Sequence, residues 1–376
     1  MTDQSNRPEW VPAEGGDAFT THVTPGVAGG HDGMSTAPRQ AAGGAPRPQR
    51  RRLTTDEHVQ GVLEGNRTIL ARTITLVESN AQAHIEHGQE VLRQLMPHTG
   101  DSIRVGITGV PGVGKSTFIE ALGCLLCDRG HRVAVLAVDP SSSVTRGSIL
   151  GDKTRMERLT RRPEAFIRPS PSAGTLGGVA RKSRETILVC EAAGFDVILV
   201  ETMGVGQSEI TVRSMVDFFM LLMLTGAGDE LQGIKKGVIE MADALLINKA
   251  DGDNKVRAQA AQADYKQALH YLAPATAGWH PQVQTCSALT GEGIGAAWDM
   301  IEQFRETTTE SGVFAERRRA QTLDWVTTLI EEYLRTSFFQ HPAVVEQIPQ
   351  IKAAVADGTM PATAAAQALV RVFEER

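Results

Sequence analysis

The sequence predicts an α/β protein in which a mostly parallel sheet is covered by helices on both faces. In the middle of the chain, short apolar runs alternate with longer segments of helical period, as they do in βαβ units. Glycine-containing turns follow several of these runs. Amphipathic helical patterns precede and follow the alternating region. We therefore expect a central α/β domain over residues 101–308, with a helical extension at each end.

Composition limits the class of protein. Of the 376 residues, 41% are hydrophobic and 22% are charged, which is ordinary for a globular protein. The net charge of -6 argues against nucleic-acid or membrane partners. No apolar run reaches the ~18 residues of a membrane span, and the N-terminus is neither an apolar signal nor an Arg-rich transit sequence. We expect a cytoplasmic protein.

Residues 1–52 form a segment of unusual composition. It holds 8 glycines and 6 prolines, few large apolar residues, and a basic end at residues 47–52. Such a segment cannot bury enough surface to offset the entropy of ordering it. We expect a disordered tail; a nucleic-acid-binding arm is the less favoured alternative.

Residues 53–100 predict an N-terminal helical extension. Thr54 and Glu57, three residues apart, match a capping box, and apolar residues then recur at helical spacing up to Pro97. Two or three amphipathic helices fit this pattern. His84 and His87 lie one turn apart, and we interpret them as solvated residues on a helix face rather than metal ligands.

Six strands are expected in the α/β domain. They are Ile103–Thr108, Val133–Val138, Val197–Val200, Phe218–Leu224, Ala244–Ile247 and Val283–Cys286. Cys124 and Cys127 lie in an apolar helical run, so we expect two buried thiols rather than a metal or redox pair.

Residues 309–376 read as helix. A break at residues 357–361 separates a final Ala-rich helix from the rest. One long stripe of apolar side chains either packs on the core or forms a dimer seam. Its members are Leu323, Val326, Leu329, Ile330, Tyr333 and Leu334.

The strongest motif is a complete G-x-x-x-x-G-K-S sequence between a predicted strand and a predicted helix over Thr117–Leu126. Glycines let the backbone approach phosphates, which successive N–H groups and the helix N-terminus then hold. Lys115 is expected at the β- and γ-phosphates and Ser116 at Mg²⁺. The predicted phosphate site consists of Gly109, Val110, Pro111, Gly112, Val113, Gly114, Lys115, Ser116 and Thr117.

A second motif, N-K-A-D, follows the predicted strand Ala244–Ile247 and indicates guanine. Asp251 can accept two hydrogen bonds from guanine, whereas adenine has no matching donor pair. Asn248 is expected to tie the loop to the phosphate region, and the stem of Lys249 to pack over the base. At a later strand end, the run Ser287, Ala288 and Leu289 offers a backbone N–H near Ala288 to guanine O6. Together these motifs predict GTP or GDP as the ligand.

Acidic residues at strand ends are candidate Mg²⁺ ligands. Asp139 and Glu201 each follow an apolar strand, so both are expected at the carboxyl edge beside the phosphate loop. Asp152, on a loop, is a further candidate. No residue is a sure equivalent of the water-orienting Gln of GTPases, and Gln207 is a weak candidate.

The combined motifs resemble the MeaB/ArgK-type G proteins, the methylmalonyl-CoA mutase-associated GTPases. The resemblance covers residues 55–350 and is carried by GVPGVGKST, AVDPSSSVTRGSILGDKTRM, PSPSAGTLGGVARK, ILVETMGVGQSE, TGAGDELQGIKKGVIEMADALLINKAD and TCSALTGEG. It implies a P-loop GTPase that forms a homodimer through its C-terminal helices. It further implies that GTP hydrolysis gates the loading of adenosylcobalamin into an acyl-CoA mutase, which the chain also protects.

The resemblance also assigns roles to residues. Asp139 and Asp152 match a switch region near Mg²⁺, and Glu201 matches the Walker B acid. Residues 226–236 match a loop that responds to the mutase, and Lys235 on it could approach the phosphates. Met203 and Thr225 depart from the usual Val and Pro of the family pattern.

Other functions stay open at this point. A metal-delivery GTPase would favour a His-rich tract or an exposed Cys-x-x-Cys, and a protein phosphotransferase would agree with an older label of the family. A non-enzymatic binding module is disfavoured by the complete nucleotide motifs. We expect any cobalamin to be held by a partner. Methylmalonyl-, hydroxyisobutyryl- and ethylmalonyl-CoA mutases are all possible partners.

Overall fold

The structure is a computed structural model that describes residues 51–138, 156–169, 176–202, 208–225 and 236–374. The chain divides into two units, Met1–Arg52 and Leu53–Arg376. The predicted tail lies almost wholly outside the described residues, and every helix and strand named below belongs to the second unit.

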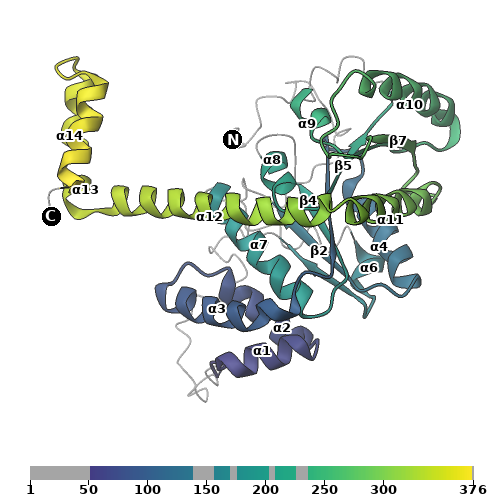
Figure 1. The fold of residues 1–376 in the computed structure, drawn as a ribbon, viewed down its shortest axis with the longest axis horizontal. Coiled ribbons are helices and arrows are strands. Elements are labelled where there is room, and N and C mark those ends of the chain that lie inside the picture. The colour runs from purple at the N-terminus through teal and green to yellow at the C-terminus, as the bar shows by residue number, and fades with distance from the viewer. Residues whose placement is uncertain (1–50, 139–155, 170–175, 203–207, 226–235, 375–376) are drawn as a thin grey trace, which may run out of the picture. The chain divides into compact units, whose positions relative to one another are not determined.

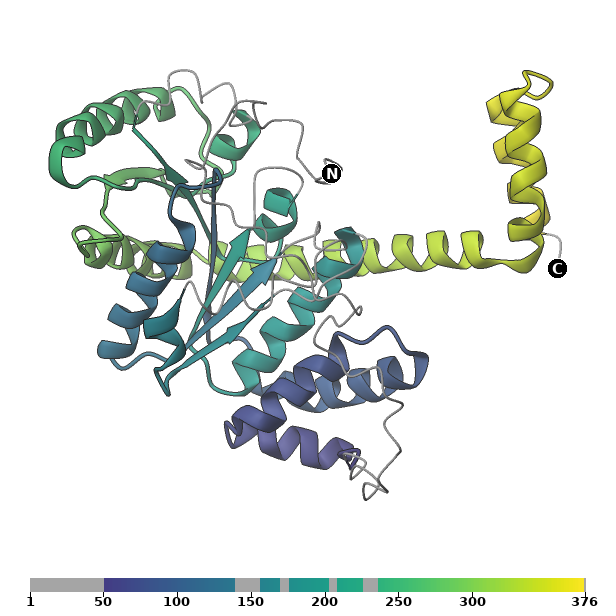
Figure 2. The same cartoon turned by 180° about the vertical axis from the view of Figure 1, so that it is seen from behind.

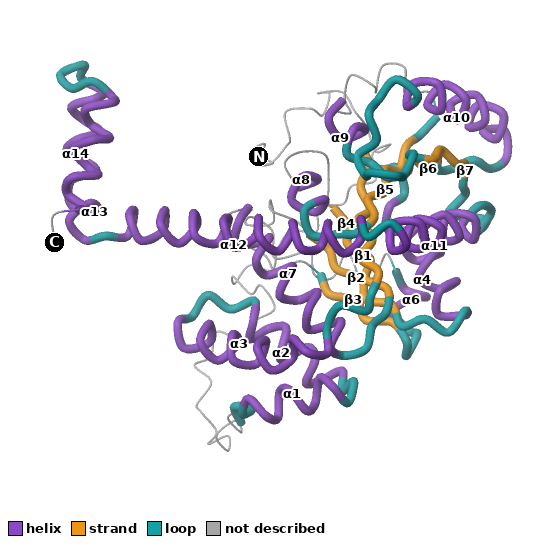
Figure 3. Tube along the Cα trace, in the orientation of Figure 1, coloured by secondary structure: helices purple, strands orange, loops and turns teal. Residues whose placement is uncertain are grey.

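A single seven-stranded sheet forms the centre of this unit (Figures 1 and 3). Every neighbouring pair of strands is parallel, and the strand order is β3-β2-β4-β1-β5-β6-β7. The predicted α/β class is thus confirmed. The strands are β1 (Ile103–Gly109), β2 (Val133–Val138), β3 (Ala165–Arg168), β4 (Val197–Thr202), β5 (Phe218–Met223), β6 (Ala244–Ile247) and β7 (Gln282–Thr285).

The sequence analysis missed β3. This strand has only four residues, lies at the edge of the sheet and ends in Arg168, so it lacks the apolar run that marks the central strands. Arg67, from the N-terminal extension, donates a hydrogen bond to the Ala165 carbonyl at 2.6 Å. That contact covers part of the backbone that an edge strand otherwise exposes.

Helices cover both faces of the sheet (Figures 1 and 2). One hydrophobic cluster joins the sheet to α7 (Leu176–Ala192), α8 (Ser208–Arg213), α9 (Lys236–Glu240) and α10 (Lys255–Leu269). A second cluster joins it to α4 (Lys115–Asp128), α6 (Glu157–Thr160) and α11 (Ile294–Glu310). Cys124 and Cys127 lie in the second cluster, and burial raises the pKa of the Cys127 thiol to about 11. The prediction of two buried thiols is confirmed.

The N-terminal extension comprises α1 (Thr55–Leu63), α2 (Arg67–Val77), α3 (Gln82–Leu95) and the short 3-10 helix η1 (Met96–His98). The predicted capping box is present, since Thr54 and Glu57 exchange hydrogen bonds at the start of α1. Apolar side chains of α2 and α3 pack in the cluster that contains α7. His84 is exposed and contacts Ser79 at 2.8 Å, as expected for a solvated histidine. His87 differs from the expectation, because it is half-buried and its ring packs edge-on against that of the buried His58.

The C-terminal region is helical, as predicted, and consists of α12 (Val313–Gln340), α13 (Pro342–Ala356) and α14 (Ala362–Glu374). Most of the predicted apolar stripe on α12 is exposed: Leu323 is 63% and Tyr333 73% accessible. The stripe therefore does not pack on the core of its own chain. Among the helices of the described ranges, none combines the length and apolar character needed to cross a bilayer.

Two buried carboxylates anchor the start of α12 to the sheet. Arg318 forms two hydrogen bonds with Asp217, at 2.7 and 2.6 Å, and Asp217 also accepts from the Arg104 N–H at 2.8 Å. Arg317 lies 3.7 Å from Asp243, whose side chain is fully buried. Because Asp217 and Asp243 each precede a strand by one residue, α12 is fixed to the amino edge of the sheet.

Candidate functional site

The phosphate loop occupies the position that this topology favours for a ligand. It follows β1, which lies between β4 and β5. The chain passes from β1 to β2 on one side and returns from β4 past β1 to β5 on the other. Ligands of open α/β sheets bind at such a point, outside the carboxyl ends of the strands. The loop leads directly into α4, so a helix N-terminus faces the same space.

Lys115 lies at the first position of α4 and is only 8% accessible. Its ammonium group folds back over the loop and donates to the carbonyls of Gly109, at 2.8 Å, and Val110, at 3.3 Å. Burial lowers the pKa of this amine, and the nearby Glu201 and Glu209 oppose that shift. The lysine is thus held within the loop that we expect to cradle the phosphates. Glu209, fully buried on α8, was not anticipated from the sequence.

Gly114 and Asn248 join the phosphate loop to the N-K-A-D loop. The Asn248 side chain donates to the Val113 carbonyl at 2.8 Å, which confirms the tie expected from the sequence. Gly114 has a φ of +96°, and a Cβ there would lie 2.8 Å from the Asn248 amide nitrogen. Only glycine fits both the backbone conformation and the close approach.

Ser116 and Glu201 meet at the carboxyl edge. The Ser116 hydroxyl donates to Glu201 Oε1 at 2.9 Å, and Glu201 is buried. A hydroxyl and a carboxylate are the hard oxygen donors that Mg²⁺ takes in proteins. The structure thus brings together two of the four predicted metal ligands, while Asp139 and Asp152 lie outside the described residues.

Asp251, the candidate guanine-binding carboxylate, is oriented by a buried serine. The Ser287 hydroxyl donates to Asp251 Oδ2 and accepts from the Thr290 N–H at 3.2 Å. Ser287 is fully buried, whereas Asp251 is half-buried. The Ser287 hydroxyl therefore fixes one carboxylate oxygen of Asp251, Oδ2. Leu289, 83% accessible, lies at the surface next to this pair.

The Ala288 N–H has a partner within the protein. It donates to Asn248 Oδ1 at 3.1 Å, so Asn248 links the Ser287–Leu289 segment to the phosphate loop as well. Guanine O6, the acceptor that we expected for this N–H, would have to share it. The other candidates, Gln207 and Lys235, lie outside the described residues.

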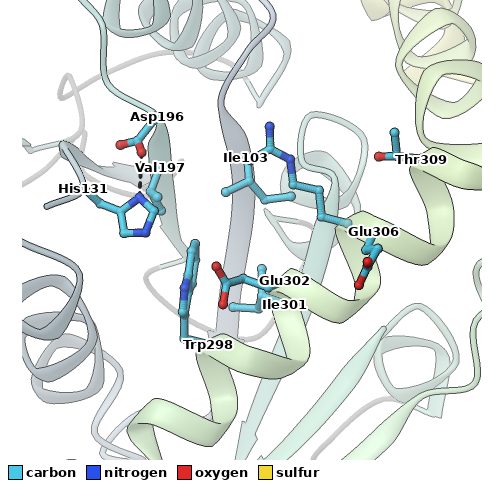
Figure 4. A pocket seen from close by; sticks show the side chains of 10 residues that line it. Ile103, His131, Asp196, Val197, Trp298, Ile301, Glu302, Glu306 and Thr309 are labelled. Carbon is cyan, nitrogen blue, oxygen red and sulfur yellow. Dashed lines mark hydrogen bonds and ion pairs between the residues drawn. The ribbon is translucent and has the colours of Figure 1, made fainter. Parts of the chain in front are cut away.

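A separate cavity of about 440 Å³ opens at the opposite edge of the sheet (Figure 4). It is lined by Ile103 and Val197, the first residues of β1 and β4, and by Trp298 of α11. His131 contacts Asp196 at 2.6 Å on its wall. None of the candidate nucleotide-site residues lines this cavity.

A parallel sheet, a complete phosphate loop after its central strand and an N-K-A-D loop bonded to it define a P-loop GTPase. The sequence profile of the family described as methylmalonyl-CoA mutase-associated GTPase MeaB matches residues 70–343. The chain belongs to this family, as the motifs indicated.

Individual relatives agree with this assignment. A protein of Caulobacter vibrioides is 53% identical over 321 residues, which cover 85% of this chain and 98% of the relative. The GTPase ArgK of Escherichia coli is 47% identical over 307 residues, which cover 82% of this chain and 93% of the relative. A crystal structure described as an LAO/AO transport system kinase superposes with a TM-score of 0.69 at 38% identity, covering 87% of this chain and 99% of that one.

Proposed function

We propose that this GTPase gates the loading of adenosylcobalamin into an acyl-CoA mutase of the methylmalonyl-CoA mutase type and protects that enzyme. The mutase is taken from the description of the family, which names methylmalonyl-CoA mutase. The observation that supports a GTP-driven role is the side chain of Asn248, which bonds to the phosphate loop through Val113 and to the candidate base-binding segment through Ala288. Through Asn248, a ligand that contacts one of these segments is therefore coupled to the other.

Mg²⁺ is proposed to bind beside the phosphates. Ser116 and Glu201 fit a hard cation, and Asp139 and Asp152 are proposed to contribute through the ion or its water shell. When bound, the ion would neutralise charge on the β- and γ-phosphates. Lys115 would add a second positive charge from the loop.

Hydrolysis also needs an oriented water and further charge stabilisation. We propose that Gln207 and Lys235 contribute to these tasks when the mutase contacts residues 226–236. Turnover by the chain alone would then be slow and would rise with the partner.

The proposal is tested by measuring phosphate release from GTP by the full chain, alone and with a purified methylmalonyl-CoA mutase from the same organism. We expect slow turnover alone and acceleration with increasing mutase. A chain carrying Lys235→Ala should keep its slow turnover and lose the acceleration. Turnover that does not respond to hydroxyisobutyryl-, ethylmalonyl- or methylmalonyl-CoA mutase would contradict the proposal.

Asp251→Asn should change the preferred base. An amide replaces the double acceptor, so affinity for GDP should fall by about tenfold to a hundredfold, which corresponds to about 1.5–3 kcal/mol for charge-assisted hydrogen bonds. Xanthine nucleotides, whose base presents an acceptor in place of the 2-amino donor, should gain relative affinity. Titration with labelled GDP and XDP measures both effects.

Asp253→Asn is the matched control, because Asp253 lies on the same turn but is exposed. Its affinity for GDP should equal that of the parent. If Asp251→Asn bound GDP as tightly as this control, Asp251 would not contact the base.

We propose that residues 309–376 form a homodimer through the exposed stripe of α12. Ile330 and Leu334 are 54% and 56% accessible and one turn apart. Full burial of such a side chain is worth about 1.5–3 kcal/mol, and these two are already half covered, so burying the rest against a second copy would stabilise the pair by about 1 kcal/mol per side chain. Ile330→Asp with Leu334→Asp should therefore yield a monomer on light scattering, with GDP binding retained.

Val256→Asp serves as the control, because Val256 is a 75% accessible apolar residue on α10. It should leave the dimer intact. A doubly substituted α12 that stayed dimeric would place the contact elsewhere.

A further inference from the structure

We propose that Thr225 and Asn254 are positioning residues that set the affinity and base selectivity of the nucleotide site. They act through the backbone of Lys249, in the middle of the N-K-A-D loop. The inference rests on the proposed guanine site, but neither residue belongs to the motif.

Lys249 has an unusual backbone. Its φ of 60° is positive, and among the described residues no other non-glycine residue has a positive φ. L-residues rarely adopt this conformation, and it persists only where the surroundings hold it. The turn lets the Ala250 N–H reach the Cys286 carbonyl at 3.0 Å, so it sets the direction in which Asp251 leaves the loop.

Asn254 supplies the holding contact. Its side-chain amide donates to the Lys249 carbonyl at 2.7 Å, five residues back along the chain. Asn254 is the N-cap residue of α10, where Asn usually accepts a hydrogen bond from the first turn of the helix. Here it makes no such cap. The Asn254 side chain instead bonds to the backbone of the N-K-A-D loop.

Thr225 holds the oxygen of the same Asn254 side-chain amide. Its hydroxyl donates to Asn254 Oδ1 at 2.7 Å. Thr225 lies two residues beyond β5, and the Asn248 N–H at the end of β6 bonds to the last carbonyl of β5, that of Met223, at 2.9 Å. Figure 3 shows β5, β6 and α10 gathered on this side of the sheet. The chain of contacts therefore runs from one strand end, through Asn254, to the backbone that presents Asp251 and the Lys249 stem.

This arrangement defines which substitutions separate positioning from simple stabilisation. Asn254→Asp keeps the size of the side chain and an acceptor for Thr225, but it cannot donate to the Lys249 carbonyl. Thr225→Val keeps the shape and removes the hydroxyl, whereas Thr225→Ser restores it. Inosine diphosphate lacks the 2-amino group of guanine, so the ratio of the affinities for GDP and IDP reports how well Asp251 is placed.

The experiment measures GDP dissociation rates and the GDP-to-IDP affinity ratio for the full chain and each variant, with thermal melting as a check on folding. One lost hydrogen bond corresponds to about a threefold to tenfold effect. We expect Asn254→Asp and Thr225→Val to speed GDP release by that factor and to reduce the GDP-to-IDP ratio, and Thr225→Ser to restore both. The double substitution should be less than additive, because the residues act in one chain of contacts.

Two outcomes would overturn the inference. Folded Asn254→Asp and Thr225→Val proteins with parental release rates would do so, as would faster release with an unchanged GDP-to-IDP ratio, which indicates stabilisation alone. The proposed guanine site is tested separately by the parent, which should prefer GDP to ADP. A parent without that preference would refute the guanine assignment itself.

Discussion

Lys115→Ala is expected to reduce GTP hydrolysis by at least a hundredfold, to judge from the loss of about 10²–10³ on removing one transition-state donor from an active site. The amine is held inside the phosphate loop by the Gly109 and Val110 carbonyls. Within the G-x-x-x-x-G-K-S sequence, Lys115 alone carries a positive charge, and its removal leaves developing negative charge on the phosphates without that partner. Phosphate release at saturating GTP measures the loss.

The fold should survive this change, because the Lys115 side chain lies over the phosphate loop and belongs to neither hydrophobic cluster. Thermal melting checks this expectation. Lys266→Ala, on the exposed face of α10, is the matched control and should hydrolyse GTP like the parent. Equal turnover in folded Lys115→Ala and Lys266→Ala proteins would remove the phosphate loop as the catalytic centre.

Arg318→Ala should strongly destabilise the folded chain. The Asp217 side chain is 1% accessible and would lose both hydrogen bonds of its only ion-pair partner within the described residues. The carbonyls of Gly100 and Ser102 would also lose a donor. Removing one partner of a buried pair costs about 3–5 kcal/mol, because an uncompensated charge remains.

Urea denaturation of Arg318→Ala and of Arg319→Ala measures this effect. Arg319 is the exposed neighbour on the same helix, so its loss should change the free energy of unfolding by less than about 0.5 kcal/mol. Adding Asp217→Asn to Arg318→Ala should recover part of the stability by removing the stranded charge. Equal unfolding free energies for the two arginine variants would show that the pair does not anchor α12.

The ion pairs that hold the start of α12 also decide how the proposed dimer can be tested. A truncation that begins before Arg317 would leave Asp217 and Asp243 without their arginines from α12, and would confuse loss of folding with loss of association. Substitutions on the exposed stripe avoid this, because Ile330 and Leu334 lie beyond the anchored part of the helix.

Much of the architecture could be predicted because its signals are local. The central strands are apolar runs with turns at their ends, and six of the seven were found, whereas β3 is too short and too polar at its end to stand out. The phosphate loop and the N-K-A-D loop could be found because their residue types and spacing are set by the ligand. Their contact through Asn248 was also foreseen and is present.

The remaining contacts are long-range and leave no pattern in the sequence. Arg318 and Asp217 are 101 residues apart, and Thr225 and Asn254 are 29 apart; neither pair has a periodicity or motif that joins its members. The Ser287 bond to Asp251 depends on how β6 and β7 are aligned. Asp139, Asp152, Gln207 and Lys235 stay predictions.

GTP hydrolysis by this chain is proposed to gate the loading of a cobalamin enzyme. The most direct test is the uptake of adenosylcobalamin by apo-methylmalonyl-CoA mutase, followed by absorbance, with the parent or Lys115→Ala chain and GTP. We predict that uptake into active mutase depends on GTP and on the parent chain, and that the Lys115→Ala chain does not support it. Uptake that is the same with the parent, with the variant and without either would contradict this role.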